Sequence, residues 1–300
     1  MVKLIGLLDQ FRSQSHRDLL MVWIGGEPLQ WTHWQRMGQM MRERNLPLGI
    51  STNGIRLGSK QIREQVLEQV SELTVSIDGL QSHHDQLRRL PGLFERLKGI
   101  VNQIQHSPRR RSVVLRVNTV LTRETIAEFP AFVEEMARWG FDELTFNPLG
   151  GNERPEFIRD HHLRLEDVQW FADRLGNVKL YASTQGLNVL GSERYLKRIF
   201  DKTCCLPHPI IDCGPGSEFL FVDDSGLASP CSFVERQWTL PIQEIETFTT
   251  LEDRFRERRG QHAFAPCGDC KANHVFEKFD RDGLPTTIPT PTFVRLNSIH

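Results

Sequence analysis

The first half of the sequence alternates short apolar runs with longer segments of helical periodicity, and this alternation restricts the fold more than any other feature. Five of the short runs are predicted to be strands. The first opens the stretch Met21–Leu29 and ends at Gly25-Gly26, and the others lie at Leu48–Gly54, Leu73–Gly79, Val113–Leu121 and Glu143–Leu149. Helices are predicted at Lys3–Ser13, Trp34–Glu43, Ile62–Val70, His84–Gln105 (interrupted at Pro91-Gly92) and Ile126–Trp139. Such alternation predicts an α/β fold with a parallel sheet.

Polar residues gather where these strands end. In parallel sheets and barrels the chemistry lies at the carboxyl ends of the strands, where loops vary without disturbing the core. A single Ser or Asn there is more simply a turn residue that bonds its own backbone. Their recurrence at successive strands predicts a binding site. The set is Gly25, Gly26, Glu27, Ser51, Thr52, Asn53, Ser76, Asp78, Arg116, Asn118 and Asn147.

The most specific of these strand ends is Gly25-Gly26-Glu27-Pro28. Two glycines let a ligand approach the backbone, because no Cβ is in the way. The Glu27 carboxylate suits an ammonium group, and Pro28 has no N–H with which to continue the strand. Taken alone, the segment is equally compatible with an ordinary strand-to-helix turn.

In this context the segment resembles the GGEP segment that closes the second strand of radical S-adenosyl-L-methionine (SAM) enzymes. The resemblance covers Lys3 to Gly151. It implies a partial (β/α)6 barrel that lacks its first strand. The resemblance also rests on Ile50–Gly54, on Val75–Gly79 and on His84-Asp85-x-x-Arg88. These segments are typical of the peptide-modifying branch of the radical SAM superfamily.

The resemblance also implies how SAM is held. Gly25, Gly26 and Glu27 would hold its methionyl amine. Arg88 or Arg116 would bind its carboxylate. The remaining implied SAM-binding residues are Ser51, Thr52, Asn53, Ser76, Asp78 and Asn118.

One part of the family pattern is not found in this sequence. Radical SAM enzymes bind a [4Fe–4S] cluster through C-x-x-x-C-x-x-C after the first strand, whereas no cysteine precedes Cys204. Two explanations stay open: the chain starts too late, or the protein is a degenerate relative without a catalytic centre. Because strand and loop are missing together, we favour truncation. As written, the chain is expected not to cleave SAM.

The six cysteines all lie in the last third of the chain, without a secretory signal, which favours metal binding over disulfides. Cys213 and Cys231 flank a predicted hairpin at Phe219–Ser229. Cys267 and Cys270 form a second pair, after a predicted helix at Leu251–Arg258. Four converging thiolates bind either a [4Fe–4S] cluster or structural zinc.

The spacing C-x12-G-x4-C followed by C-x-x-C resembles the SPASM/Twitch extension of radical SAM enzymes. The resemblance implies a small α+β Twitch-like domain with one auxiliary [4Fe–4S] cluster on Cys213, Cys231, Cys267 and Cys270, and favours iron–sulfur over zinc. Cys204 and Cys205 fall outside the pattern and are expected to be buried thiols. The other hypothesis is that one of them is a redox-active or substrate-facing thiol near the mouth of the cavity.

The predicted organisation has four parts. Residues 1–151 are the incomplete barrel, and 152–203 a helical linker or substrate region with helices at Leu165–Leu175 and Glu193–Asp201. Residues 204–279 are the cluster domain, and the proline-containing tail 280–300 is expected to be loosely ordered.

Charge and hydropathy exclude two kinds of partner. The net charge is −1 at pH 7 and 25% of residues are charged, so nothing indicates nucleic acid or a membrane surface. No run of about eighteen apolar residues occurs, and the amphipathic N-terminus has no small-residue cleavage site. We therefore expect a cytoplasmic protein.

For the complete protein the resemblance implies a radical SAM oxidoreductase or maturase. An electron from a donor such as ferredoxin or flavodoxin would reduce SAM to methionine and a 5′-deoxyadenosyl radical. This radical would abstract hydrogen from a peptide or small-molecule substrate. The other hypothesis is a non-catalytic binding scaffold with one structural metal site.

Overall fold

The structure, a computed structural model, describes residues 1–300 except 16, 151–154, 211, 212, 215, 217, 234–237, 262–264, 281–291, 299 and 300. Its strands form one sheet in the order β6-β5-β4-β3-β2-β1-β10-β7-β8-β9. They are β1 Leu19–Gly25, β2 Leu48–Thr52, β3 Glu72–Ser76, β4 Val114–Leu121, β5 Glu143–Pro148, β6 Asn188–Val189, β7 Phe219–Val222, β8 Leu227–Ser229, β9 Leu240–Pro241 and β10 Thr292–Ser298.

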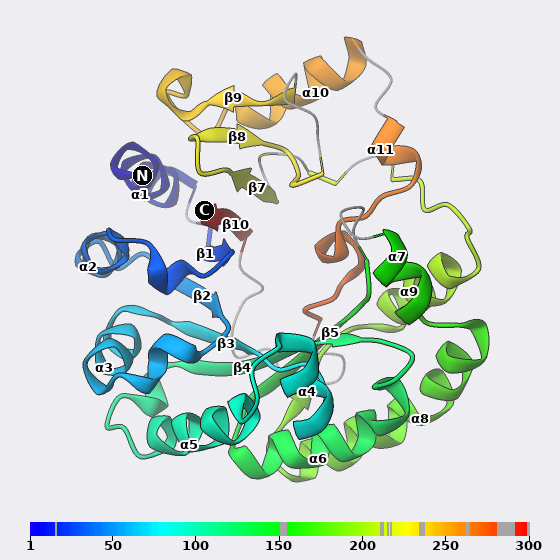
Figure 1. Ribbon diagram of the computed structural model, residues 1–300. Coiled ribbons are helices and arrows are strands. Elements are labelled where there is room, and N and C mark those ends of the chain that lie inside the picture. The colour runs from blue at the N-terminus through cyan, green and yellow to red at the C-terminus, as the bar shows by residue number, and fades with distance from the viewer. Residues whose placement is uncertain are drawn as a thin grey trace.

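The five predicted strands are β1 to β5, and each pairs in parallel with the next in sequence. β6 adds a further parallel strand beside β5. The sheet curves around a common interior, with helices on its outer side (Figure 1). The predicted α/β fold with a parallel sheet is therefore confirmed.

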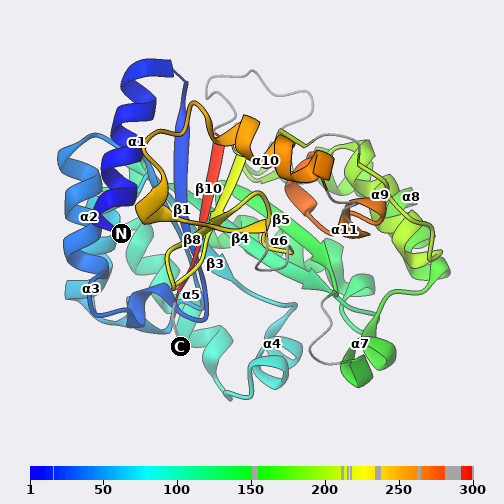
Figure 2. The ribbon, with the colours of Figure 1, turned by 90° about the horizontal axis from the view of Figure 1, so that it is seen from above.

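The predicted helices are present with small differences at their ends. The helices of the described residues are α1 Val2–Ser15, α2 Trp34–Glu43, α3 Lys60–Gln69, α4 Gln81–Arg88, α5 Leu93–Gln105, α6 Phe129–Trp139, α7 Pro155–His161, α8 Leu165–Thr184, α9 Glu193–Thr203, α10 Leu251–Gln261 and α11 Ala265–Gly268. Figure 2 shows α1–α3 and α8–α9 on opposite sides of the molecule. None of the helices in the described residues is long and apolar enough to span a membrane.

The core lies between the strands and this outer layer of helices. Helix α5 illustrates the pattern, because it buries Leu93, Leu97, Ile100 and Ile104 at helical spacing. The predicted interruption before α5 is real: Gly92 has φ 78°, in the left-handed region that glycine adopts without strain.

The cysteine-rich part adds a small antiparallel unit. β7 and β8 pair antiparallel around the predicted turn, and β9 pairs with β8. The Asp223 carboxylate accepts the N–H of Leu227 at 2.8 Å, and Gly226 has φ 80°. The predicted hairpin is confirmed.

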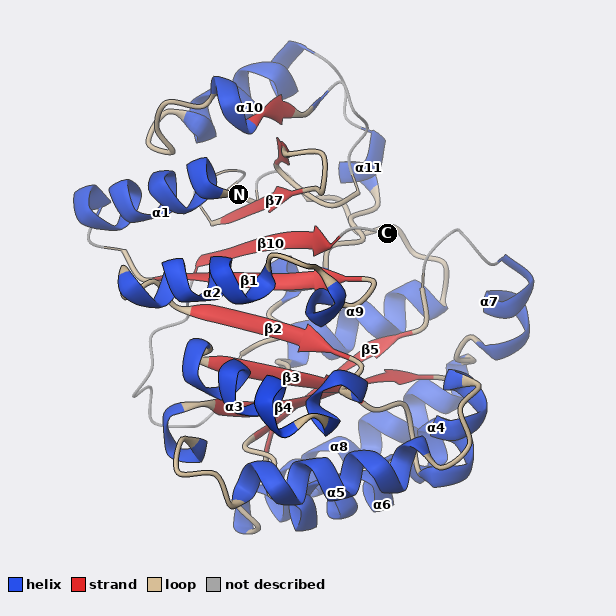
Figure 3. Ribbon diagram, turned by 60° about the vertical axis from the view of Figure 1, so that its left-hand side comes forward, coloured by secondary structure: helices blue, strands red, loops and turns tan. Residues whose placement is uncertain are grey.

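β10 differs from the expectation of a loosely ordered tail, of which residues 281–291 lie outside the described part of the chain. Residues 292–298 pair in parallel with β1, from Leu19↔Thr292 to Gly25↔Ser298, and with β7 on the other side (Figure 3). The threonine, phenylalanine and valine that open this segment favour extended structure. Pairing also covers the backbone groups of the β1 edge.

Arg116 does not belong to the strand-end set in which the sequence placed it. It is the third residue of β4, beside Glu143, the first residue of β5. Its guanidinium donates to Glu72 at 2.8 Å and to Glu143 at 2.9 Å, and all three residues are buried. Burial disfavours the charge, yet the two carboxylates raise the pKa of Arg116 above its ordinary value. We therefore correct the hypothesis that Arg116 binds the SAM carboxylate.

Replacing Arg116 by Met is expected to lower the free energy of unfolding by about 3–5 kcal/mol, because two buried carboxylates lose their shared counter-ion. Urea denaturation measures this. Arg42→Met, which removes an exposed ion pair with Glu68, is the control and should change little. Adding Glu72→Gln and Glu143→Gln should recover part of the loss. A single variant as stable as the parent would contradict this account.

Candidate functional site

The chain turns at the carboxyl end of β1, and the backbone of this turn is exposed. Gly25, the last residue of β1, has φ 111°, and both Gly25 and Gly26 are exposed. Trp23, two residues earlier, is buried. An exposed corner without Cβ atoms offers its peptide groups to a ligand. This geometry fits the predicted contact with the SAM amine.

Glu27 connects this corner to the end of β2. Its side chain is buried, and one carboxylate oxygen accepts the Thr52 hydroxyl at 2.6 Å. The other accepts the Asn53 N–H at 2.8 Å. Glu27 also caps the short helix Pro28–Gln30 by accepting the N–H of Leu29 at 3.2 Å. Glu27 therefore aligns two strand ends, a role that the sequence did not reveal.

Thr52 and Asn53 also bond their own turn. The Thr52 hydroxyl accepts the N–H of Gly54 at 3.0 Å, and the Asn53 amide oxygen accepts the N–H of Ile55 at 2.9 Å. Both the turn role and the strand-end position are thus real for these two residues. Ser51 and Ser76 are half-buried on the neighbouring strands β2 and β3.

The His84-Asp85-x-x-Arg88 motif surrounds Asp78. His84 accepts the backbone N–H of Asp78 at 3.0 Å through Nδ1, and Arg88 pairs with the Asp78 carboxylate at 2.6 Å. Asp85 caps α5 by accepting the N–H groups of Gly92 and Phe94 at 2.6 and 2.8 Å. Burial lowers the pKa of His84 to about 4, so the ring is neutral and accepts through Nδ1. The motif thus fixes the loop after β3, and Arg88 lies against Asp78.

The ends of β4 and β5 meet the C-terminal part of the chain. The Asn118 amide oxygen accepts from Thr145 and Asn147 at 3.0 Å each and from Lys278 Nζ at 2.9 Å. Asn273 donates to Asn147 at 2.9 Å. In Figure 1 the segment that carries Asn273 and Lys278 runs inward toward β5. Sequence reasoning missed both residues, because no local signal shows which distant segment enters the barrel.

The four predicted cluster ligands are all partly buried. The other three cysteines affect the pKa of Cys231. Burial first, and then the neighbouring Cys270, Cys213 and Cys267, raise its pKa to about 12 against the lowering effect of the Phe233 N–H. Two backbone hydrogen bonds of 2.9 Å each hold the segment before Cys213 against the second pair, from the Ile210 N–H to the Cys267 carbonyl and from the Cys270 N–H to the His208 carbonyl.

Within the described residues, no group of three or more His, Cys, Asp or Glu side chains is positioned to hold a metal ion as the side chains stand. The donor types nevertheless suit a cluster, since all four predicted ligands are cysteines and all are partly buried. Thiolates are the ligands of [4Fe–4S] clusters. Burial and mutual repulsion of thiolates are what a bound cationic core relieves.

The expectation that Cys204 and Cys205 are buried thiols is wrong for both residues. Cys204 is half-buried at the end of α9, whereas Cys205 is exposed with φ 56°. Helix α9 ends just before these two residues, and Cys205, which follows the C-cap, is exposed to solvent.

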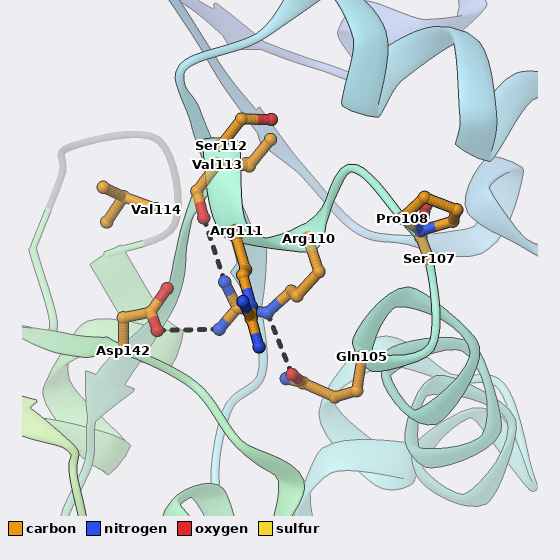
Figure 4. A pocket seen from close by; sticks show the side chains of 9 residues that line it. All are labelled: Gln105, Ser107, Pro108, Arg110, Arg111, Ser112, Val113, Val114 and Asp142. Carbon is orange, nitrogen blue, oxygen red and sulfur yellow. Dashed lines mark hydrogen bonds and ion pairs between the residues drawn. The ribbon is translucent and has the colours of Figure 1, made fainter.

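A pocket of about 930 Å³ lies at the opposite end of the strands (Figure 4). Arg110 crosses it, donating to Asp142 at 2.7 Å and to Gln105 at 2.9 Å. Asp142 precedes β5 and Val114 begins β4. The pocket therefore opens at the amino ends and is separate from the predicted site.

Comparison with known proteins shows which folds this arrangement is similar to. No family model matches the chain. The AdoMet-dependent heme synthase of Methanosarcina barkeri (strain Fusaro / DSM 804) is 23% identical over 275 residues, covering 85% of this chain and 75% of that protein. SuiB of Streptococcus suis bound to S-adenosylmethionine aligns with a TM-score of 0.63 and 14% identity, over 98% of this chain and 68% of that one. The chain has the radical SAM fold.

A second solved radical SAM enzyme, anSMEcpe with bound AdoMet, aligns with a TM-score of 0.59 and 16% identity, over 92% of this chain and 79% of that one. The resemblance identified from the sequence is thereby confirmed. So is the predicted fold class, a partial radical SAM barrel followed by a small Twitch/SPASM-like unit.

The neutral state of His84 predicts a pH dependence of stability. The unfolded chain takes up a proton near the ordinary pKa of 6.5, whereas the folded ring stays neutral to about pH 4. The free energy of unfolding should therefore fall as pH drops from 6.5 to 4, by up to about 3 kcal/mol.

Denaturation at several pH values measures this decline. His84→Asn keeps an acceptor for the Asp78 N–H and cannot titrate, so it should flatten the decline. His106→Asn, at an exposed histidine, is the control and should keep it. Equal slopes in the parent and His84→Asn would refute the assignment.

Glu27→Gln places an amide N–H₂ where a carboxylate oxygen accepts the Thr52 hydroxyl or the Asn53 N–H. Losing one buried acceptor is expected to reduce the free energy of unfolding by about 1–3 kcal/mol. Amide hydrogen exchange at Asn53 should accelerate. Glu43→Gln, at an exposed residue of α2, is the control. Unchanged exchange at Asn53 would show that Glu27 does not join the two strands.

Proposed function

We propose that this chain supplies the SAM-binding barrel and the auxiliary cluster of a radical SAM oxidoreductase of the maturase type. The observation that carries the proposal is the exposed Gly25–Gly26 corner, which Glu27 aligns with Thr52 and Asn53 on the next strand. Two structures of the same fold, SuiB and anSMEcpe, contain SAM. Both support a SAM site on the carboxyl edge of this sheet.

In this proposal the chain's own residues position the cofactor. The backbone of Gly25 and Gly26 would bind the methionyl amine, and Glu27 would keep the corner in place. Ser51, Thr52 and Asn53 at the end of β2, Ser76 and Asp78 at the end of β3, and Asn118 on β4 would line the ribose and carboxylate side. Arg88 would bring its charge to the SAM carboxylate from beside Asp78. When bound beside a reduced cluster, SAM supplies the hydrogen-abstracting group of this superfamily.

The second cofactor in the proposal is one [4Fe–4S] cluster on Cys213, Cys231, Cys267 and Cys270. The high pKa of Cys231 means that the free thiol keeps its proton at neutral pH. Loading would therefore release protons and be favoured by raised pH. The cluster would accept the substrate electron or brace the small antiparallel unit.

We propose a peptide substrate and a soluble electron donor such as ferredoxin or flavodoxin. SuiB has been solved with its precursor peptide SuiA, and anSMEcpe with the Cp18Cys peptide. A small-molecule substrate is the second candidate, since the heme synthase is also a relative. Binding of SuiA-like peptides, measured by fluorescence anisotropy with tetrapyrroles as competitors, separates the two candidates.

Anaerobic reconstitution tests the cofactor assignment. The chain should bind ~4 iron and ~4 sulfide, as one [4Fe–4S] cluster requires. Cys231→Ser should lose most of the iron, whereas Cys205→Ser, at the exposed cysteine outside the set, should keep it. Anaerobically prepared protein that contains zinc and no iron would overturn the proposal.

A further inference from the structure

Arg198 is a buried cation beside one of the proposed cluster ligands. It lies on α9 and is only 2% exposed. Its Nη2 donates to the carbonyl of Cys270 at 2.9 Å. Its guanidinium carbon lies 4.6 Å from the centre of the Phe276 ring. The first contact is to the second cysteine of the Cys267–Cys270 pair, and the second contact is to the segment that follows this pair.

The hydrogen-bonding capacity of Arg198 is mostly unused. In the described part of the chain, Nε and Nη1 are buried and have no hydrogen-bond partner. Asp201, three residues further along α9, pairs with Lys197 and with His208 at 3.4 Å instead. Asp269, beside Cys270, is exposed and accepts the His208 N–H at 3.4 Å. A buried guanidinium in this state is costly unless an anion lies nearby.

We propose that Arg198 is the counter-ion of the auxiliary cluster and raises its reduction potential. This inference rests on the proposed function, since it requires iron–sulfur on the four cysteines. A [4Fe–4S] core with four thiolates carries net negative charge, which grows by one on reduction. A fixed cation in a poorly solvated site stabilises the more negative, reduced form. Arg198 is thus a positioning residue that acts through Cys270.

Two replacements separate charge from shape. Arg198→Gln removes the charge and keeps an N–H donor for the Cys270 carbonyl, whereas Arg198→Lys keeps the charge and loses the planar fork. Arg194→Met is the matched control, because Arg194 lies one turn earlier on α9, is exposed and pairs with Glu277 at 3.1 Å. Each variant is reconstituted anaerobically and titrated with dithionite while EPR and visible absorption are followed.

Arg198→Gln should shift the reduction equilibrium at least tenfold toward the oxidised cluster. For a one-electron couple, this corresponds to a reduction potential that is at least 59 mV more negative. Arg198→Lys and Arg194→Met should stay close to the parent. Equal potentials in Arg198→Gln and the parent, at equal iron content, overturn the inference and leave the proposed function intact.

Iron content provides a second readout. If Arg198→Gln fails to retain iron and Arg198→Lys retains it, the charge is needed for the bound cluster and the proposal stands. If both variants lose the iron and the parent retains it, the role is structural and the proposal fails. A parent chain that takes up no iron at all refutes the proposed function instead.

Discussion

The site depends on one buried group, the Glu27 carboxylate, which accepts hydrogen bonds from the Thr52 hydroxyl and the Asn53 N–H. Parallel strands pair through their backbones, yet nothing in that pairing determines how their loops leave the sheet. Glu27 couples the two loops because each of its oxygens takes a donor from the next strand. The glycines beside it can then remain exposed without the corner collapsing onto the barrel.

A second coupling joins the barrel to the cysteine-rich unit. After Cys270 the chain enters the barrel, where Asn273 and Lys278 donate to Asn147 and Asn118. Backbone bonds from Gly191 to the Asp280 carbonyl and from Ser192 to the Glu277 carbonyl, at 3.1 and 3.3 Å, support the same segment. The segment after Cys270 is therefore tied to Asn118 on β4.

The two ends of the sheet handle charge in different ways. At the amino ends, the Arg116 guanidinium pairs with both Glu72 and Glu143, so it is not available to bind a ligand. At the carboxyl ends and near the cysteines, side chains are half-exposed or incompletely bonded, as Ser51, Ser76 and Arg198 show. This division follows from folding: the amino ends stabilise the barrel, and the carboxyl ends leave room for cofactors.

Local sequence patterns alone were enough to predict the parallel sheet, the break at Pro91-Gly92 and the hairpin around Asp223 and Gly226. Periodicity and turn chemistry act between near neighbours, and both are written in consecutive residues. Only the tertiary structure decided the partner of Arg116, the place of β10 between β1 and β7, and the arrival of Lys278 at Asn118. Those contacts join residues far apart in the chain, so their outcome depends on which surfaces the assembled barrel leaves open.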